Sequence, residues 1–348
     1  MHHKKLIAAM VAVGVSMPAL AVADMTLYGR AHLSTDLLDD GADYSELNIS
    51  SNSSRLGFKG QHEVNPNLTA IFQIEQEIFF DTKDNSEDFA TRDTFAGLKG
   101  DWGMVRIGRF DTPFKKARGP ANFFGDQVGD MRNLTKANGN FDDRFRNTLH
   151  YQSPALGGMV WDISYSPENT SEETKEESEN SAFSTSLGFE EGPMNVIVAY
   201  ERQNYQDSPN PDGWRLAGAY EVTPAFTLAG FFQSTEGRVQ EVKNGPWLDG
   251  PEGEVFGVGG QYQLSPSMYL KAHYFTLDSD CDDSDADMYT LGLEYRMDKA
   301  LRFYGNLAAV SNDDAAALTP WGQARSATPP GEAGETATAF SLGMRYDF

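Results

Sequence analysis

The chain has 348 residues, with 51 acidic and 28 basic side chains, and its formal net charge is −23 at pH 7. A surface this acidic excludes nucleic acid as a partner, because binding to a phosphate backbone needs a basic patch. The single cysteine, Cys281, excludes an intramolecular disulfide, so backbone hydrogen bonds and packing must stabilise the fold.

The first 23 residues are predicted to be a secretory signal peptide rather than part of the fold. A positively charged start is followed by the apolar run Leu6–Val15 and by the small-residue cleavage site Ala21–Ala23. A membrane-spanning helix is the alternative, but the apolar run is short for a bilayer and Pro18 interrupts it. We therefore expect an exported mature chain of residues 24–348, whose net charge is −25 once Lys4 and Lys5 are removed.

Apolar and polar residues alternate through most of the mature chain. A period of two with one apolar face predicts β-strands. The opposite face carries charges, amides and glycine rather than a second apolar set. The clearest apolar sets are Trp214, Leu216, Tyr220 and Val222; Phe256, Val258, Tyr262 and Leu264; Tyr289, Leu291, Leu293 and Tyr295; and, at the end of the chain, Phe340, Leu342, Met344, Tyr346 and Phe348.

Short turns and long polar loops alternate between these strands. Seven turns and eight loops separate sixteen strands, which leaves both chain ends on the short-turn side. The predicted turns are Glu63–Asn67, Asp101–Gly103, Ala155–Gly158, Glu190–Pro193, Thr223–Ala225, Ser265–Ser267 and Asp298–Ala300. The predicted loops are Asp39–Asn52, Asp81–Ala90, Asp111–Asp143, Glu168–Ser181, Gln206–Asp212, Gly237–Gly253, Leu277–Asp287 and Ser311–Glu335.

These patterns predict an all-β fold, a transmembrane antiparallel β-barrel of about sixteen strands. In hydrocarbon every backbone amide must be paired within the protein, and a closed sheet achieves this. The apolar set would face lipid and the polar set a water-filled lumen. A soluble sandwich would turn its apolar face inward and would rarely use so many strands in one domain. The low mean hydropathy of −0.48 does not argue against a barrel, because alternating strands give little window signal.

The loop at residues 111–143 is predicted to fold into the lumen as the pore constriction. Connections this long are usually functional or disordered. Between Arg109 and Arg146 there are eight basic and five acidic residues, an excess of three positive charges in a strongly acidic chain. A solvated surface loop of mixed charge is the simpler alternative.

Several short segments resemble the general porins of Gram-negative outer membranes. The resemblance is densest in the first half of the chain and at its terminus. The segments are Leu27-Tyr28-Gly29-Arg30, Ser54-Arg55-Leu56-Gly57-Phe58-Lys59-Gly60, Arg92 with Phe95-Ala96-Gly97-Leu98-Lys99-Gly100, Gly108-Arg109, Arg146-Asn147, Tyr151-Gln152-Ser153-Pro154 and Tyr346-Asp347-Phe348.

This resemblance implies a sixteen-stranded homotrimer in the outer membrane, with a basic ladder in the lumen facing acids of the third loop. By position, the ladder would be Arg30, Arg55, Arg92 and Arg146, and alternation also points Arg55 and Arg146 inward, with Phe145 and Leu149 outside. Asn122 stands where many relatives carry glutamate, so Asp126 and Asp130 are the candidate acids. Arg109 is the candidate trimer contact, facing a neighbour's Glu87 or Asp88.

The expected function is passive diffusion of ions and small hydrophilic solutes through the pore, with weak charge selectivity of undecided sign. A substrate-specific channel for phosphate or an oligosaccharide is the main alternative. A barrel-type outer-membrane hydrolase is less favoured, because the histidines of the mature chain, His32, His62, His150 and His273, have no spacing that suggests a catalytic set. We expect no catalytic residue and no cofactor.

Two loops are strongly acidic, at 168–179 and 278–287. The second lacks the glycine and closing glutamate of an EF-hand, so no dedicated metal site is predicted. A solvated acidic face is one interpretation. Diffuse binding of divalent cations, shared with lipopolysaccharide phosphates at the lipid surface, is the other.

Overall fold

The structure is a computed structural model that describes residues 24–81, 89–139, 141–168, 180–205, 209–239 and 248–348. The predicted signal peptide, residues 1–23, lies outside this range. Within it, no helix is long and apolar enough to cross a membrane.

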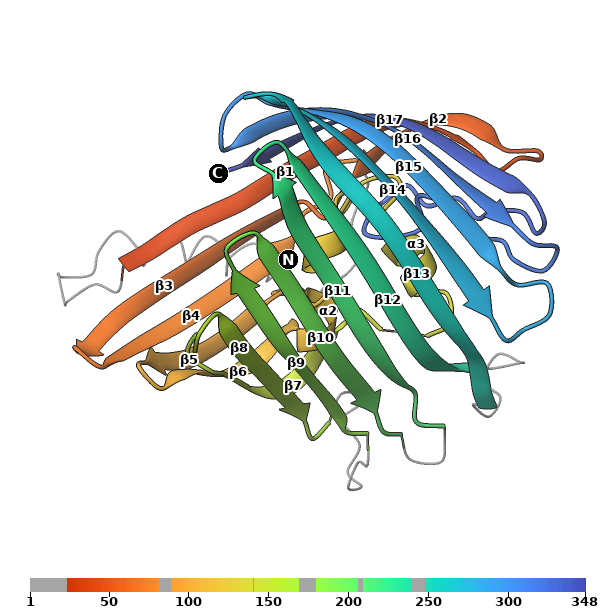
Figure 1. The fold of residues 1–348 in the computed structure, drawn as a ribbon. Helices are drawn as coiled ribbons and strands as arrows, with labels where there is room; N and C mark the ends of the chain where they lie inside the picture. The colour runs from red at the N-terminus through yellow and green to blue at the C-terminus, as the bar shows by residue number, and fades with distance from the viewer. Residues whose placement is uncertain (1–23, 82–88, 140, 169–179, 206–208, 240–247) are drawn as a thin grey trace, which may run out of the picture.

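One antiparallel sheet closes on itself to form the barrel (Figure 1). β1 (Asp24–Asp39) pairs with β17 (Thr336–Asp347), which closes the ring. β2 (Ser45–Ser51) and β3 (Arg55–Asn65) both pair with β1, so they are two halves of one broken strand. The seventeen strand segments of the described residues therefore form sixteen barrel strands, as predicted. The others are β4 (Leu68–Glu77), β5 (Thr94–Gly100), β6 (Gly103–Asp111), β7 (Arg144–Gln152), β8 (Met159–Ser166), β9 (Ala182–Glu191), β10 (Met194–Gln203), β11 (Asp212–Thr223), β12 (Phe226–Val239), β13 (Leu248–Ser265), β14 (Met268–Ser279), β15 (Ala286–Arg296) and β16 (Leu301–Asn312).

All seven predicted turns join neighbouring strands at one end of the barrel, and both described chain ends lie at that end. The prediction of a long first loop at Asp39–Asn52 is wrong. Most of that segment is β2, which leaves only residues 40–44 in the hairpin loop. Leu47 and Ile49 continue the outward apolar face there, and the Ser- and Asn-rich composition around them is typical of a loop rather than a strand.

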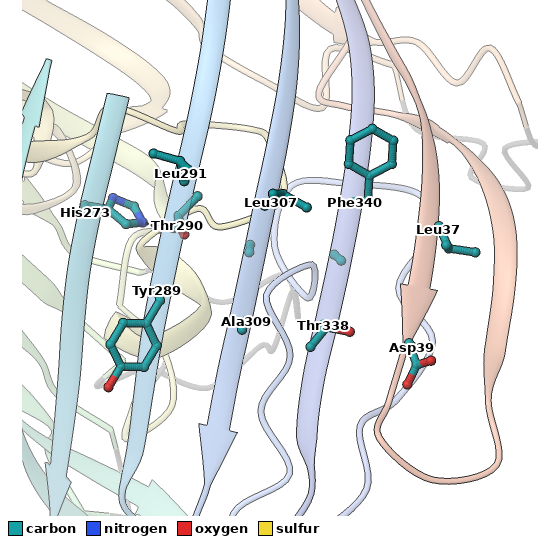
Figure 2. Close-up of a pocket in the computed structure, with 12 residues that line it drawn as sticks. Leu37, Asp39, His273, Tyr289, Thr290, Leu291, Leu307, Ala309, Thr338 and Phe340 are labelled. Atoms are coloured by element: carbon teal, nitrogen blue, oxygen red, sulfur yellow. Dashed lines mark hydrogen bonds between the residues drawn. The ribbon is translucent and has the colours of Figure 1, made fainter. Parts of the chain in front are cut away.

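The barrel is apolar outside and polar inside, as alternation predicts. On β17, Leu342 is 56% exposed whereas its neighbour Ser341 is completely buried. Leu291, Leu307, Phe340 and Leu37 are paired across four neighbouring strands and form one outward row (Figure 2). These four residues, with Ala309 and Tyr289, help to line an open groove of about 580 Å³.

The alternation fails near the start of β7. Phe145 is completely buried, so the prediction that it faces outward is wrong. The pairing of β6 with β7 shifts register between Gly108 and Phe110, and Asn147 has a φ of +48°. Such a bulge inserts an extra residue and changes which side chains face each side of the sheet.

Candidate pore constriction

The loop between β6 and β7 contains three short helical segments. These are α2 (Pro113–Lys116), a 3₁₀ turn at Gly119–Ala121 and α3 (Arg132–Thr135). Met131 and Leu134 are completely buried in one apolar cluster with inward-facing residues of the opposite strands. That cluster includes Phe231, Val255, Phe275, Leu277, Met288 and Val310. The lumen-facing side of β12–β16 is therefore locally apolar, and it holds the loop inside the barrel (Figure 1).

A buried ion pair fixes both ends of this loop to the barrel wall. Arg215 of β11 donates through Nη1 to Asp142 Oδ1 at 2.6 Å and to the Phe114 carbonyl at 2.8 Å. The side chains of Arg215 and Asp142 are both completely buried. Burial alone would raise the pKa of Asp142, but the guanidinium groups of Arg215 and Arg118 hold that pKa well below its usual range.

The tip of the loop presents Asp126 to the first strands of the barrel. Asp126 has a φ of +63°, and its backbone N–H donates to Asp130 Oδ2 at 2.7 Å. Its carboxylate lies 2.8 Å from Arg132, 3.4 Å from Arg30 and 3.5 Å from Arg55. Burial would raise the pKa of Asp126, but these guanidiniums, Arg132 foremost, keep it well below the ordinary value. Asp130 pairs with Arg132 and is fully buried, so it supports the tip rather than facing the arginine wall.

The facing wall is not purely basic. Glu75 of β4 accepts from Arg92 Nε at 2.7 Å, lies 3.7 Å from Arg55, and also accepts from the Tyr28 hydroxyl. Asp347 of β17 accepts from Arg30 Nε at 2.7 Å. Arg30, Arg55 and Arg92 therefore share one connected network with acids that sequence reasoning did not single out. The sequence offered one indication of these acids: Glu75 and Asp347 fall on inward-facing positions of their strands.

Further along the sheet, Arg144 at the start of β7 contacts two acids. It lies 2.7 Å from Asp93 and 3.0 Å from Asp111, which also pairs with Lys115. Burial lowers the pKa of Lys115 to about 8. Arg146 lies two residues further along β7, beside the bulge, with its side chain half-buried. Its role in the ladder stays a prediction.

A second loop, residues 313–335 between β16 and β17, also folds into the barrel. Trp321 is completely buried in a cluster with Leu38 and Val128, and the Gly129 N–H of the constriction loop donates to the Pro320 carbonyl at 2.6 Å. Arg325 pairs with Asp36 on β1, and both side chains are completely buried. The sequence predicts a long polar loop at Ser311–Glu335 without this inward contact. An isolated Trp321 next to Pro320 was the only signal.

The two acidic loops are described only in part. Residues 169–179 lie outside the structure's described ranges. In 278–287, Asp285 accepts from the Ser279 backbone and Asp287 from the Tyr274 hydroxyl. No three His, Cys, Asp or Glu side chains of the described residues gather closely enough to hold a metal ion.

Diffuse attraction of divalent cations to these loops stays a prediction. If it is correct, chelation with EDTA should speed proteolytic cleavage of both loops in detergent-solubilised protein, because the carboxylates would then repel one another. Cleavage at the same rate with and without EDTA would contradict it.

Comparison with known proteins agrees with this geometry. The family model for Gram-negative porins matches residues 8–315. The outer membrane porin protein 32 of Delftia acidovorans is 27% identical over 99% of this chain and 100% of its own length. The major outer membrane protein P.IB of Neisseria sicca is 28% identical over 46% of this chain and 47% of its own length.

Among solved structures, the anion-selective porin from Comamonas acidovorans matches with a TM-score of 0.81 at 23% identity, covering 94% of this chain and all of that one. OmpF of Salmonella typhi, solved in complex with daunomycin, matches with a TM-score of 0.69 at 15% identity, covering 94% of this chain and 98% of that one. These similarities concern the fold. With the family match spanning most of the chain, they establish that this protein belongs to the Gram-negative porins and resides in the outer membrane.

Proposed function

We propose that the protein is a water-filled channel for passive diffusion of ions and small hydrophilic solutes, with a weak preference for anions. The preference for anions is argued from the net charge of one ion-pair network, which extends from the constriction toward the short-turn end of the barrel. This network joins eight basic to six acidic side chains, an excess of two positive charges in a chain of net charge −23. Its members are Arg30, Arg55, Arg92, Arg132, Lys271, Arg296, Arg302 and Arg345, with Glu75, Glu77, Asp126, Asp130, Glu294 and Asp347.

The magnitude of this excess argues for a weak filter rather than a trap. In water, two unit charges about 8 Å apart interact by about 0.5 kcal/mol. Two uncompensated positive charges therefore favour a monovalent anion over a neutral solute by about fivefold. Salt reduces this further, because the Debye length at 0.1 M is about 10 Å. Conduction needs such weakness, since ions must leave the pore as readily as they enter. The anion-selective porin that shares this fold supports the same sign.

The reversal potential of the channel in a potassium chloride gradient tests this proposal. We expect the sign for chloride preference in the unaltered protein, and a shift of the chloride-to-potassium permeability ratio by about threefold to fivefold toward potassium in Arg30→Gln/Arg55→Gln. Arg202→Gln is the matched control, because Arg202 lies on β10 away from the constriction with its side chain 45% exposed. Potassium preference in the unaltered channel would contradict the proposal.

A hydrolase is the less favoured function, because the hydrogen bonds of His150 do not suit a general base. Arg106 Nε donates to its Nδ1 at 3.2 Å, and its Nε2 lies 2.7 Å from Asp162 Oδ1. Both ring nitrogens are thus engaged, which leaves neither to activate a serine or a water molecule. His32 and His273 are buried and bonded to Tyr304 and Thr290 respectively.

We infer that the mature chain, residues 24–348, works as a homotrimer embedded in outer-membrane lipid and lipopolysaccharide. The apolar outer surface of the barrel supports contact with lipid. A trimer form is known for OmpT of Vibrio cholerae, which shares the fold. Arg109, on β6, is the candidate contact, and its candidate partners Glu87 and Asp88 lie outside the described residues.

If Arg109 joins the subunits, Arg109→Ala should dissociate to monomers at a lower temperature in detergent than the unaltered protein. The expected shift is a few degrees, because a partly exposed ion pair contributes about 0.2–1 kcal/mol. Semi-native electrophoresis after stepwise heating measures it. Identical dissociation temperatures would remove Arg109 from the interface.

A further inference from the structure

Three arginines lie directly opposite one another on neighbouring strands at the short-turn end of the lumen. Arg296 of β15 pairs in register with Arg302 of β16, and Arg302 pairs with Arg345 of β17. Residues directly opposite in an antiparallel pair have Cβ atoms about 5 Å apart, so like charges there destabilise the sheet. Negative charges near these three arginines would offset that cost.

The protein's own acids compensate only part of this charge. Glu294 lies 2.6 Å from Arg296 and 3.0 Å from Lys271, and Asp347 lies 2.8 Å from Arg345 and 2.7 Å from Arg30. Lys271, Arg296, Arg302 and Arg345 therefore share two carboxylates, one of which also pairs with Arg30. Arg302 receives the least, because its nearest carboxylate oxygens are 3.8 Å and 4.0 Å away, beyond hydrogen-bond distance.

An open pocket of about 510 Å³ adjoins Arg302. It is lined by Pro266, Ser267, Arg296, Met297, Asp298, Lys299 and Arg302, from the β13–β14 and β15–β16 turns, and therefore sits at the short-turn rim. Short turns lie on the periplasmic side of outer-membrane barrels. In the part of the chain that the structure describes, no carboxylate comes within ion-pair distance of Lys299.

The pocket is organised to accept an anion. The Arg296 guanidinium is held in place by stacking 3.8 Å from the Tyr269 ring and by a bond to Gln261. Asp298 is the one acid of the lining, and the three basic side chains Arg296, Lys299 and Arg302 outweigh its negative charge. Its Oδ1 accepts the backbone N–H groups of Ala300 and Leu301, both at 2.7 Å, so it is committed to the turn.

We propose that this pocket is a weak binding site for small dianions, such as inorganic phosphate or a short dicarboxylate, at the periplasmic exit of the channel. Arg302 supplies the planar donor fork that matches phosphate and carboxylate oxygens, and Lys299 adds a mobile point charge. The site rests on the proposed function, because an anion reaches it through the lumen only if the constriction admits anions. It concentrates dianions at the rim without narrowing the constriction.

Oriented channels in a planar bilayer test the pocket with inorganic phosphate as the probe. Phosphate added to the periplasmic compartment should reduce the chloride current with a half-saturating concentration in the millimolar range. In Lys299→Gln/Arg302→Gln this concentration should rise by about tenfold, because two direct charge contacts, each worth about fivefold in water, are lost and salt screens part of their effect. Lys99→Gln is the matched control, because it removes a positive charge at the short-turn end of β5, on another part of the rim. Its half-saturating concentration should be unchanged.

The outcomes separate this proposal from the one on which it rests. An equal phosphate effect in all three channels, or none in the unaltered channel, overturns the pocket. A chloride-preferring reversal potential recorded in the same channels would leave the proposed function standing in that case. Should the double variant fold poorly, the single variant Lys299→Gln, at an exposed turn position, must still weaken the phosphate effect, and an unchanged value overturns the pocket.

Discussion

Replacing Arg215 by methionine should release the constriction loop from the barrel wall. Asp142 would lose its 2.6 Å partner and be left with Arg118, 3.3 Å away. The cost should therefore stay below the full penalty for an uncompensated member of a buried pair, which is about 3–5 kcal/mol. The Phe114 carbonyl would lose its donor as well. We expect a channel with larger and noisier single-channel conductance and a melting temperature lower by several degrees, measured in planar bilayers and by circular dichroism in detergent.

A second substitution distinguishes a specific loop anchor from a general loss of packing. In Arg215→Met/Asp142→Leu both charges are gone, and replacing a buried ion pair by apolar groups is often neutral or stabilising. The double variant should therefore recover most of the stability and the quiet conductance. Arg202→Met, which removes a partly exposed partner of Asp212, should change stability by less than about 1 kcal/mol. A double variant as noisy as the single one would mean that the ion pair does not hold the loop.

Replacing Asp36 by asparagine should detach the second inner loop, residues 313–335, from β1. The substitution removes the carboxylate that pairs with the buried Arg325, so the guanidinium would have to leave the protein interior or stay uncompensated at a cost of several kcal/mol. The bond from Gly129 to Pro320 links this loop to the constriction loop, so the tip carrying Asp126 should become more mobile as well.

Limited digestion with trypsin measures this detachment at the anchoring residue itself. The Arg325 side chain is completely buried in the native fold, so cleavage after it should be slow. Cleavage should become faster by an order of magnitude or more in Asp36→Asn. Asp314→Asn is the matched control, since Asp314 lies exposed at the start of the same loop. Equal cleavage rates after Arg325 in all three proteins would rule out the ion pair as the anchor.

The sequence identified the first strands' arginines and Asp126 as neighbours, but not the acids that neutralise them. Arg30, Arg55 and Asp126 meet in the structure, whereas Glu75 and Asp347 were not predicted as their partners. A period-two pattern tells which face a residue occupies, but the lateral neighbour depends on register between strands. Asp347 and Arg30 are 317 residues apart and meet only because β1 and β17 close the ring.

The start of β7 shows the same dependence on strand pairing within one hairpin. Alternation counted back from Leu149 predicts that Arg146 points inward and Phe145 outward. The bulge between β6 and β7 adds a residue out of phase, which buries Phe145. Arg144 is paired in register with Asp111 and contacts Asp93 and Asp111. Bulges carry little signal in a single sequence, because the extra residue is defined only by its mismatch with a residue on the partner strand.

The sequence by itself determined the barrel, its strand count, the sidedness of its turns and the apolar outer surface. Each of these depends on spacing along one strand, where backbone geometry forces successive side chains to opposite faces. Only the tertiary structure decided which charges pair in the lumen, that residues 313–335 fold inward beside the constriction loop, and that an arginine row ends in an open pocket at the rim. Those features depend on contacts between segments that are distant in the chain. The free energy of such contacts depends on strand register and burial, which no local sequence pattern encodes.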